Sequence, residues 1–471
     1  MLAALALACT GGPTIVNETG TLVLDLVNPT EADPWEGVDS VVIELLVDGK
    51  VVESARFDVD EEAELPELDH FGTGRFTVAG IAGSSVVSFG RSAEVLLAPG
   101  QDLTVPITFL PVNQVLPLSD EMASERSDHA AVVLPDGRVL LAGGRSPDGN
   151  QAFDELELYD PSIGGFVPTG SYLPGPMFGM IAESGFRGEI FLAGGYSNMG
   201  GTVRPERSFL AYDPISGQVD IQTPTTSPRA GGCFVEFREN YGAYVGGTDE
   251  TLAIDYLRPD PDEGEWTWSD VVVADLDQEG VTGCAKLPDG RVFLQGLKLE
   301  STGLFDFSEE AAAANPNISD AFYPVSTGDV ELLTGGLIVP LTDKVWVGAG
   351  KDKTGQVLDS GRLFDPETLA FVGGVDPGRP RVGGSWDSWI DEDWVALGCG
   401  SPDGDLAKSQ TTIELLNLMS GDRYPYLEAD RSRPGCQLNV LHDGSILLTG
   451  GYGDSDAGLA SAAIAVPYDA D

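Results

Sequence analysis

The sequence predicts an all-β protein in which a small β-sandwich precedes a seven-bladed β-propeller. Three observations lead to this prediction. The 471 residues include 60 glycines and 31 prolines, a composition typical of many short strands joined by tight turns. An apolar strand that ends in glycine recurs about every 50 residues from residue 138 onwards. Residues 18–111 contain alternating strands that lack this period.

The repeated strand reads RVLLAGG at 138–144 and SILLTGG at 445–451, with five related copies between them. The glycine on which the copies align stands at positions 143, 194, 246, 296, 348, 398 and 450. These positions are 51, 52, 50, 52, 50 and 52 residues apart, which is too regular for chance. The chain is therefore predicted to be a repeat protein with one structural unit per copy.

Each copy has further strand and turn signals around this glycine. Small residues open the preceding strand, and Leu-Pro-Asp-Gly turns at 134–137 and 287–290 join two strands. A third strand ends in an aromatic residue, Asp and Pro, because proline cannot continue a β-ladder. Copies of this ending are Tyr159-Asp160-Pro161, Tyr212-Asp213-Pro214 and Phe364-Asp365-Pro366. With a fourth strand after it, each unit predicts a propeller blade, whose crowded innermost strand requires Gly and Ala.

The apolar strand, Gly-Gly, aromatic-Asp-Pro and the fourth strand together resemble the kelch repeat over about residues 114–471. The seventh copy ends with a third strand in SAAIAVPYDAD, and no fourth strand follows it. We therefore expect residues 112–122 to form the outer strand of the last blade and to close the ring. The predicted domains are a signal remnant and tether (1–17), the sandwich (18–111) and a kelch-like propeller (112–471).

Residues 18–111 contain about seven predicted strands, which indicates an immunoglobulin-like or transthyretin-like sandwich. Asp48-Gly49 stands between two apolar runs and predicts a β-hairpin. The segment has no cysteine, so packing alone must hold it together. We expect this domain to hold the propeller away from a membrane.

The formal net charge of −49 makes the surface repel phosphate backbones, which excludes nucleic acid as a partner. The N-terminal sequence MLAALALAC resembles the end of a bacterial lipoprotein signal, and this resemblance implies acylation of Cys9. The protein is then expected in the bacterial cell envelope, as a monomer that contacts the membrane only through this lipid anchor. A secreted protein with a cleaved signal and an intracellular protein are the alternatives.

The remaining cysteines fall in neighbouring blades. Cys233 and Cys284 begin the innermost strands of the third and fourth copies, whereas Cys399 and Cys436 belong to the sixth and seventh. An even number of cysteines in an exported chain predicts the disulfides Cys233–Cys284 and Cys399–Cys436. Buried free thiols are the alternative.

Residues typical of catalysis or metal binding are scarce. The histidines are His70 in the sandwich, His129 at an innermost strand and His442 in a turn on the opposite face, so they cannot form one site. Some kelch proteins, such as galactose oxidase, bind copper through His and Tyr, and this chain lacks that constellation. We therefore predict no catalytic residue, no metal site and no cofactor. Calcium in the acidic loops 260–265 and 453–458 is the alternative to solvated turns there.

Arginines precede several innermost strands, namely Arg126, Arg229, Arg379 or Arg381, and Arg431 or Arg433. In so acidic a chain they either surround the channel mouth and bind an anionic ligand or pair with acidic residues of the same rim. The candidate ligand face comprises Arg126, His129, Arg229, Arg379 and Arg433. Trp386 and Trp389 are candidates either for stacking on a sugar or for packing between blades.

The expected function is that of a surface-anchored or exported binding protein without enzymatic activity, whose propeller face engages a protein or a glycan. The alternative is a periplasmic or secreted carbohydrate-active propeller enzyme, similar to kelch-like mutarotases. Scarce histidine and the lack of a recognisable acid–base pair favour the binding protein.

Overall fold

The computed structural model describes residues 14–16, 21–59, 72–98, 101–146, 148–199, 201–238, 241–247, 253–259, 266–272, 281–296, 302–306, 322–325, 335–352, 354–389, 393–404, 412–429, 433, 435–452 and 460–468. All elements of secondary structure in these segments are β-strands. The same segments contain no helix that is long and apolar enough to cross a membrane. The strands belong to an N-terminal module and to a series of sheets that follows it.

Two sheets form the N-terminal module. The first contains β1 (Thr14–Val16), β2 (Thr21–Val27) and β8 (Leu103–Thr108). The second contains β3 (Ser40–Val47), β4 (Lys50–Asp58), β5 (Gly72–Ala82), β6 (Ser85–Arg91), β7 (Val95–Leu97) and β9 (Leu110–Pro111). Leu24 of the first sheet and Val78 of the second lie in one buried hydrophobic cluster. Asp48 and Gly49 turn the β3–β4 hairpin with positive φ angles, whereas the parallel pairing of β2 with β8 is a feature that residue alternation does not reveal.

Seven sheets of four antiparallel strands make up most of the remaining described chain, and we number them in chain order. Sheet 1 contains β11 (Ala130–Val133), β12 (Val139–Ala142), β13 (Glu155–Asp160) and β14 (Gly165–Tyr172). Sheet 2 contains β16 (Ile181–Ser184), β17 (Ile190–Ala193), β20 (Phe209–Asp213) and β21 (Gln218–Ile221). Sheet 3 contains β22 (Cys233–Arg238), β23 (Tyr241–Val245), β24 (Ala253–Pro259) and β25 (Trp266–Val272). Sheet 4 contains β26 (Val281–Lys286), β27 (Val292–Gly296), β28 (Gly303–Phe305) and β29 (Phe322–Pro324).

Sheets 5 to 7 have the same order of strands. Sheet 5 contains β30 (Leu337–Pro340), β31 (Val345–Gly348), β32 (Gly361–Asp365) and β33 (Ala370–Val372). Sheet 6 contains β34 (Val382–Ser388), β35 (Trp394–Ser401), β36 (Thr412–Asn417) and β37 (Leu427–Glu428). Sheet 7 contains β38 (Gln437–Val440), β39 (Ile446–Thr449), β40 (Ser461–Ala465) and β10 (Val115–Glu121). Beside sheet 2, β15 (Met177–Phe178) pairs with the hairpin of β18 (Tyr196–Met199) and β19 (Thr202–Pro205).

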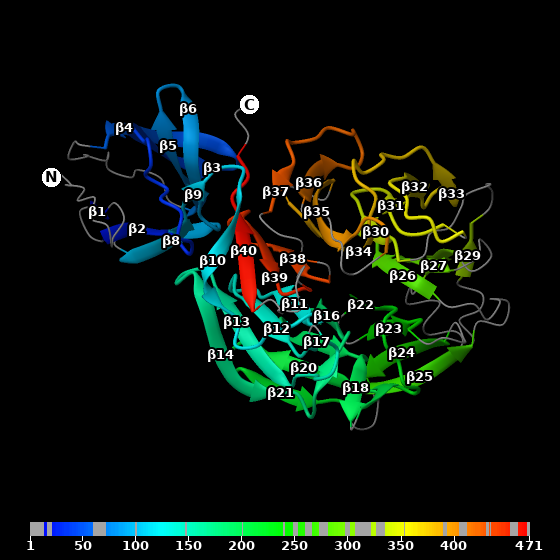
Figure 1. Ribbon diagram of the computed structural model, residues 1–471. Helices are drawn as coiled ribbons and strands as arrows, with labels where there is room; N and C mark the ends of the chain where they lie inside the picture. Colours follow the sequence, from blue (N-terminus) through cyan, green and yellow to red (C-terminus); the bar gives the residue numbers. More distant parts are fainter. Residues whose placement is uncertain are drawn as a thin grey trace.

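The sheets follow one another around a closed path (Figure 1). The first strand of each sheet contacts the first strand of the next, and β38 of sheet 7 contacts β11 of sheet 1. A buried hydrophobic cluster joins each pair of neighbouring sheets around this path. Because burial of apolar surface drives this packing, each sheet is held by its two neighbours.

The second strand of a sheet is buried on both faces, which explains its uninterrupted apolar sequence. In β12, Val139 and Leu141 pack in the cluster with sheet 7, whereas Leu140 and Ala142 pack in the cluster with sheet 2. Alternate residues of a strand point to opposite faces, so each of these side chains reaches one neighbouring sheet. At Gly143, φ is 61° and a Cβ atom would lie 2.3 Å from the backbone oxygen of Met177. The glycine therefore permits the close approach of β15, the short strand beside sheet 2.

Two kinds of link join segments that are distant in the sequence. β10 is the outer strand of sheet 7 and pairs with β40, with Val115 opposite Ala465 (Figure 1). The disulfide Cys233–Cys284 joins sheets 3 and 4, and Cys399–Cys436 joins sheets 6 and 7. Both disulfides predicted from the sequence are thereby confirmed. Two disulfides in one chain are typical of an exported protein, and this part of the predicted localisation is supported.

Arginines in two of the turns between first and second strands also link neighbouring sheets. Arg138 of sheet 1 donates a hydrogen bond to the backbone oxygen of Pro214 in sheet 2, at 3.3 Å. Arg291 of sheet 4 donates to the backbone oxygen of Pro366 in sheet 5, also at 3.3 Å. Both acceptors are the prolines of aromatic-Asp-Pro sequences. This motif therefore ends a strand and also supplies an acceptor to the preceding sheet.

The N-terminal module contacts the end of the sheets that carries these turns. Arg91 Nε donates to the backbone oxygen of Asp443, in the β38–β39 turn, at 2.9 Å. The amide of Ser119 on β10 donates to the backbone oxygen of Pro29 at 2.8 Å. We call the end at which the innermost strands begin the strand-start face. The N-terminal module is attached at the opposite end.

Candidate functional site

Four of the arginines considered above are buried. Arg126, Arg229 and Arg381 are 0 % exposed, and Arg433 is 2 % exposed. Three of them meet a carboxylate on the third strand of their own sheet: Arg126 meets Glu157 at 3.6 Å, Arg229 meets Asp255 at 3.1 Å, and Arg381 meets Glu414. Arg433 donates to the backbone oxygen of Ser461 at 2.7 Å. A guanidinium in such a place cannot contact a ligand on the surface of the rim.

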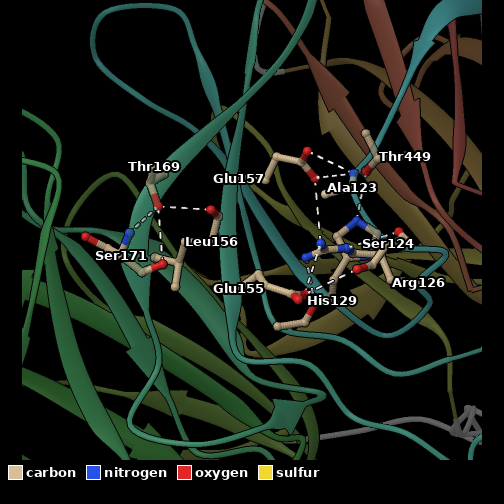
Figure 2. A network of polar contacts seen from close by, with 11 residues as sticks. Ala123, Ser124, Arg126, His129, Glu155, Leu156, Glu157, Thr169, Ser171 and Thr449 are labelled. Atoms are coloured by element: carbon tan, nitrogen blue, oxygen red, sulfur yellow. Dashed lines mark hydrogen bonds and ion pairs between the residues drawn. The ribbon is translucent and has the colours of Figure 1, made fainter.

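The buried arginines tie together three parts of a sheet. In Figure 2, the guanidinium of Arg126 lies beside Glu155 and Glu157. Arg126 Nη1 also donates to the backbone oxygen of Gly143 at 3.1 Å, as Arg229 Nη1 does to Gly246 at 2.7 Å. Each of these two arginines therefore joins the segment before the first strand to the glycine end of the second strand and to the third. Both arginines therefore pair with acidic residues, which is the second of the two alternatives considered from the sequence.

His129 is buried in the same region (Figure 2). Its Nε2 lies 2.9 Å from Thr449 Oγ1 of sheet 7. Burial and the nearby charge of Arg126 lower the pKa of His129 to about 3. The ring is therefore neutral at physiological pH and links sheets 1 and 7, instead of facing a ligand.

The other candidates from the sequence are scattered. Arg379 is exposed, and its guanidinium lies 5.2 Å from the centre of the Tyr426 ring. Trp389 is buried and donates through Nε1 to the backbone oxygen of Gly444 at 3.1 Å, so it packs between sheets. His442 is exposed in the β38–β39 turn, at the end opposite to the strand-start face. Outside the described residues lie Cys9, His70, Arg431 and the acidic loops 260–265 and 453–458.

One repeated position on the strand-start face differs in sheet 1. In six sheets, the residue at the beginning of the innermost strand has a φ angle between 53° and 71°, and these residues are Asp128, Gly179, Gly231, Gly335, Gly383 and Gly435. Glycine adopts this left-handed region without steric cost, whereas a residue with a Cβ atom does not. Of the six, only Asp128 has a side chain. A non-glycine residue held in this conformation is a frequent mark of a functional site.

The carboxylate of Asp128 contacts side chains of sheets 1 and 7. Its Oδ2 accepts hydrogen bonds from Arg145 Nε at 2.6 Å and from the Tyr452 hydroxyl at 2.8 Å. A longer bond of 3.4 Å from Ser127 also ends on Oδ2. Among the residues that the structure describes, the donors to this carboxylate thus all reach Oδ2, and a substrate can approach Oδ1. The side chains of Asp128 and Arg145 are 31 % and 30 % exposed, so a solute can reach them.

The groups around Asp128 keep distinct charge states. Burial raises the pKa of Tyr452, and the negative charge of Asp128 adds to this effect, so the phenol stays protonated at neutral pH. The Tyr452 ring packs over Gly435, where a Cβ atom would lie 3.0 Å from the ring. The Arg145 guanidinium lies 4.7 Å from the centre of the Phe178 ring. A carboxylate, a phenol and a guanidinium thus meet on the strand-start face.

Sequence reasoning missed these three residues, although the sequence contains a signal for them. Arg145 and Tyr452 each follow the Gly-Gly pair of a repeat directly, and Asp128 stands where most copies have glycine. The regular repeat draws attention to what the copies share. A site in a ring of similar units depends instead on the positions at which single units differ.

A second cluster of ionisable groups lies along the innermost strands of sheets 2 to 4. Lys286 on β26 donates to the backbone oxygen of Glu236 on β22 at 2.8 Å, and the Glu236 carboxylate accepts a bond of 2.7 Å from the amide of Phe186. Burial raises the pKa of Glu183, on β16, to about 7; the charge of Glu236 adds to the shift, while Lys286 opposes it.

We expect Glu183 to make the protein less stable as pH rises from about 4.5 to about 7. In this window the folded protein keeps the proton on Glu183 and the unfolded chain releases it, so the folded state binds more protons. Raising the pH then favours unfolding. Urea denaturation of the wild type and of Glu183→Gln across the window measures the effect: the loss should be smaller in the variant. Equal pH dependence of the two proteins would contradict the assignment.

No protein-family model matches the sequence, and no curated protein matches it. Among solved structures, the chain is similar to a fungal alcohol oxidase of the AA5 family in complex with copper, with a TM-score of 0.53 and 14 % sequence identity. The similarity covers 74 % of this chain and 76 % of that chain. At this identity the likeness shows the fold, and it confirms that the chain has an all-β fold of the propeller class.

This neighbour corrects three expectations drawn from the sequence. It is an enzyme, which contradicts the expected binding protein without enzymatic activity and favours the alternative, a carbohydrate-active propeller enzyme. The expectation that the chain is not an enzyme falls with it. The neighbour also contains copper. This contradicts the expectation from the sequence, which was no cofactor or, as the alternative, calcium. These predictions relied on the scarcity of histidine and the lack of a recognisable acid–base pair in the sequence. A propeller assembles its site from separate blades, so no linear motif reveals the site.

The residues that the structure describes do not fit a copper centre of their own. Among them there is no group of three or more His, Cys, Asp or Glu residues that could hold a metal ion. The ring of His129 is buried against Thr449, and the described cysteines are bonded to one another in the two disulfides. We therefore derive no chemical step through copper.

Proposed function

We propose that the seven sheets are the blades of one closed propeller and that the N-terminal module is an immunoglobulin-like sandwich in front of it. The circle of contacts among the first strands and the hydrophobic cluster between each pair of sheets support the ring. The pairing of β10 with β40 supports its closure by a strand from outside the repeats. Acylation of Cys9 as a membrane anchor is part of the same proposal.

We further propose that the protein is an exported enzyme that acts on a carbohydrate, with the strand-start face as its active site. The observation that carries this proposal is Asp128, a partly exposed carboxylate with a φ angle of 53° at a position where five other sheets have glycine. One solved structure of similar fold is an alcohol oxidase, and a hydroxyl-bearing substrate is consistent with it.

The proposed chemistry is acid–base catalysis of the opening and closing of a sugar ring. Asp128 Oδ1 accepts the proton of the anomeric hydroxyl while the carbonyl forms at that carbon. Tyr452 donates its phenolic proton to the ring oxygen as the bond between this oxygen and the anomeric carbon breaks. Arg145 orients the carboxylate through its 2.6 Å hydrogen bond. Closure of the ring on the other face of the carbonyl returns both protons to their original groups.

The interconversion of sugar anomers tests this proposal. Freshly dissolved single anomers of reducing sugars, followed by polarimetry, should equilibrate faster with the protein than without it. Tyr452→Phe should remove the acceleration, because phenylalanine cannot donate the proton. An acceleration that persists in Tyr452→Phe would overturn the mechanism. Oxidation of primary alcohols by copper-loaded protein, without any effect on anomer exchange, would overturn the proposed reaction.

A further inference from the structure

A cavity opens on the strand-start face, among the beginnings of four innermost strands. Its volume is about 280 Å³, and residues of sheets 3, 4, 5 and 6 line it. Four of these are the glycines Gly232, Gly283, Gly336 and Gly384. Since these residues have no side chains, the backbone forms much of the wall. The volume lies near the lower limit for pockets that bind small molecules, which suits one ring rather than an extended chain.

The wall of this cavity is electrically neutral. None of the described residues that line it is charged, although the chain has a net charge of −49. An anionic ligand would therefore find no cation in the wall and would enter against the overall field of the protein. A cationic ligand would find no carboxylate there. The neutral wall favours a ligand without charge.

Trp386 gives the cavity an aromatic side. Its side chain lines the cavity and is half-buried, because its other contacts are with the hydrophobic cluster between sheets 5 and 6. An indole held in this way offers a rigid apolar face, and the glycine backbone next to it offers hydrogen-bonding groups. This combination suits a ring with apolar C–H faces and a hydroxyl-bearing rim.

The disulfide Cys233–Cys284 adds rigidity to the same wall. Both cysteines line the cavity, and their bond fixes the beginnings of β22 and β26 relative to each other, with a Cα–Cα distance of 5.8 Å. A wall that is held before the ligand arrives loses little conformational entropy on binding. The second disulfide, Cys399–Cys436, is buried in the cluster between sheets 6 and 7 and does not line the cavity.

From these features we infer that the cavity is a binding subsite for the ring of a neutral sugar, with Trp386 as its stacking surface. The inference rests on the proposed function for the presence of a carbohydrate substrate, and it adds that the substrate lacks a charged group on the ring held here. Asp128 and Tyr452 lie on the same face, in sheets 1 and 7. The subsite and the acid–base pair are therefore separate parts of the strand-start face.

Direct binding of two matched probes tests the inference. D-glucose and D-glucuronate have the same ring and differ in the charge at C6. Isothermal titration of the full protein should detect D-glucose and show at least about tenfold weaker binding of D-glucuronate. Trp386→Ala should weaken the binding of D-glucose by about tenfold, and Trp386→Phe should restore most of it because an aromatic face remains. Phe186→Ala is the matched control, since this exposed aromatic residue lies at the other end of the innermost strands and should leave the binding unchanged.

The outcomes separate this inference from the proposed function. Binding of D-glucose that is unchanged in Trp386→Ala, or equal binding of the two probes, would overturn the subsite. The acid–base proposal would survive those results if Tyr452→Phe still abolished anomer exchange. Conversely, D-glucose bound through Trp386 by a protein that does not exchange anomers would support the subsite and overturn the acid–base proposal.

Discussion

Replacement of Asp128 by asparagine is expected to slow anomer exchange by about 10²- to 10⁴-fold while the protein stays folded. Asparagine also tolerates the left-handed conformation, which has a φ angle of 53° here, and its amide oxygen still accepts hydrogen bonds from Arg145 and Tyr452. It cannot accept the substrate proton at neutral pH. The initial rate in polarimetry and the melting temperature measure the two properties separately.

Asp128→Gly is a matched control, because it removes the carboxylate and relieves the backbone at the same time. We expect this variant to be inactive and to melt no earlier than the wild type. Glycine adopts the left-handed conformation at no steric cost, and a partly exposed pair such as Asp128–Arg145 contributes at most about 1 kcal/mol. Turnover that persists in either variant would exclude Asp128 as the base. Early melting of Asp128→Gly would show that the aspartate is structural.

Arg229→Ala is expected to lower the free energy of unfolding by about 3–5 kcal/mol. Arg229 and Asp255 are both 0 % exposed, and their side chains meet at 3.1 Å. Removal of the cation leaves a buried carboxylate without its ion-pair partner, and this penalty exceeds the loss of the contact itself. Urea denaturation, with the midpoint and slope determined for each variant, measures the difference.

Two further variants show whether the ion pair is the cause. The double variant Arg229→Met, Asp255→Leu removes both charges and should lose clearly less stability than Arg229→Ala, because no isolated charge stays buried. Arg379→Ala removes an exposed arginine and should change stability by no more than about 0.5 kcal/mol. If Arg229→Ala lowers the free energy of unfolding by less than about 1 kcal/mol and abolishes ligand binding, the structural role is wrong and Arg229 contacts the ligand.

The disulfides and the arginines show how far a repeat leads when structure is predicted from sequence. The pairs Cys233–Cys284 and Cys399–Cys436 follow from the period. The first pair occupies equivalent places in neighbouring units, and the second joins the end of a second strand to the beginning of the next first strand, two places on the same face of the ring. The place of the arginines before the innermost strands is also read from the sequence. Their burial was not predictable, because the partner of Arg229 lies on the third strand, 26 residues away, in a part of the repeat that has no fixed motif.

From the order of amino acids alone follow the repeating unit, the propeller class and the pairing of the cysteines, because short-range patterns of burial and turn residues encode each unit. The folded chain was needed to show which differences between units come together. Asp128 and Tyr452 are 324 residues apart and meet only because sheet 7 returns to lie beside sheet 1. A pattern of buried residues predicts the contacts within one unit. The contact between the first and last units depends on the number of units in the closed ring, which is a property of the tertiary structure.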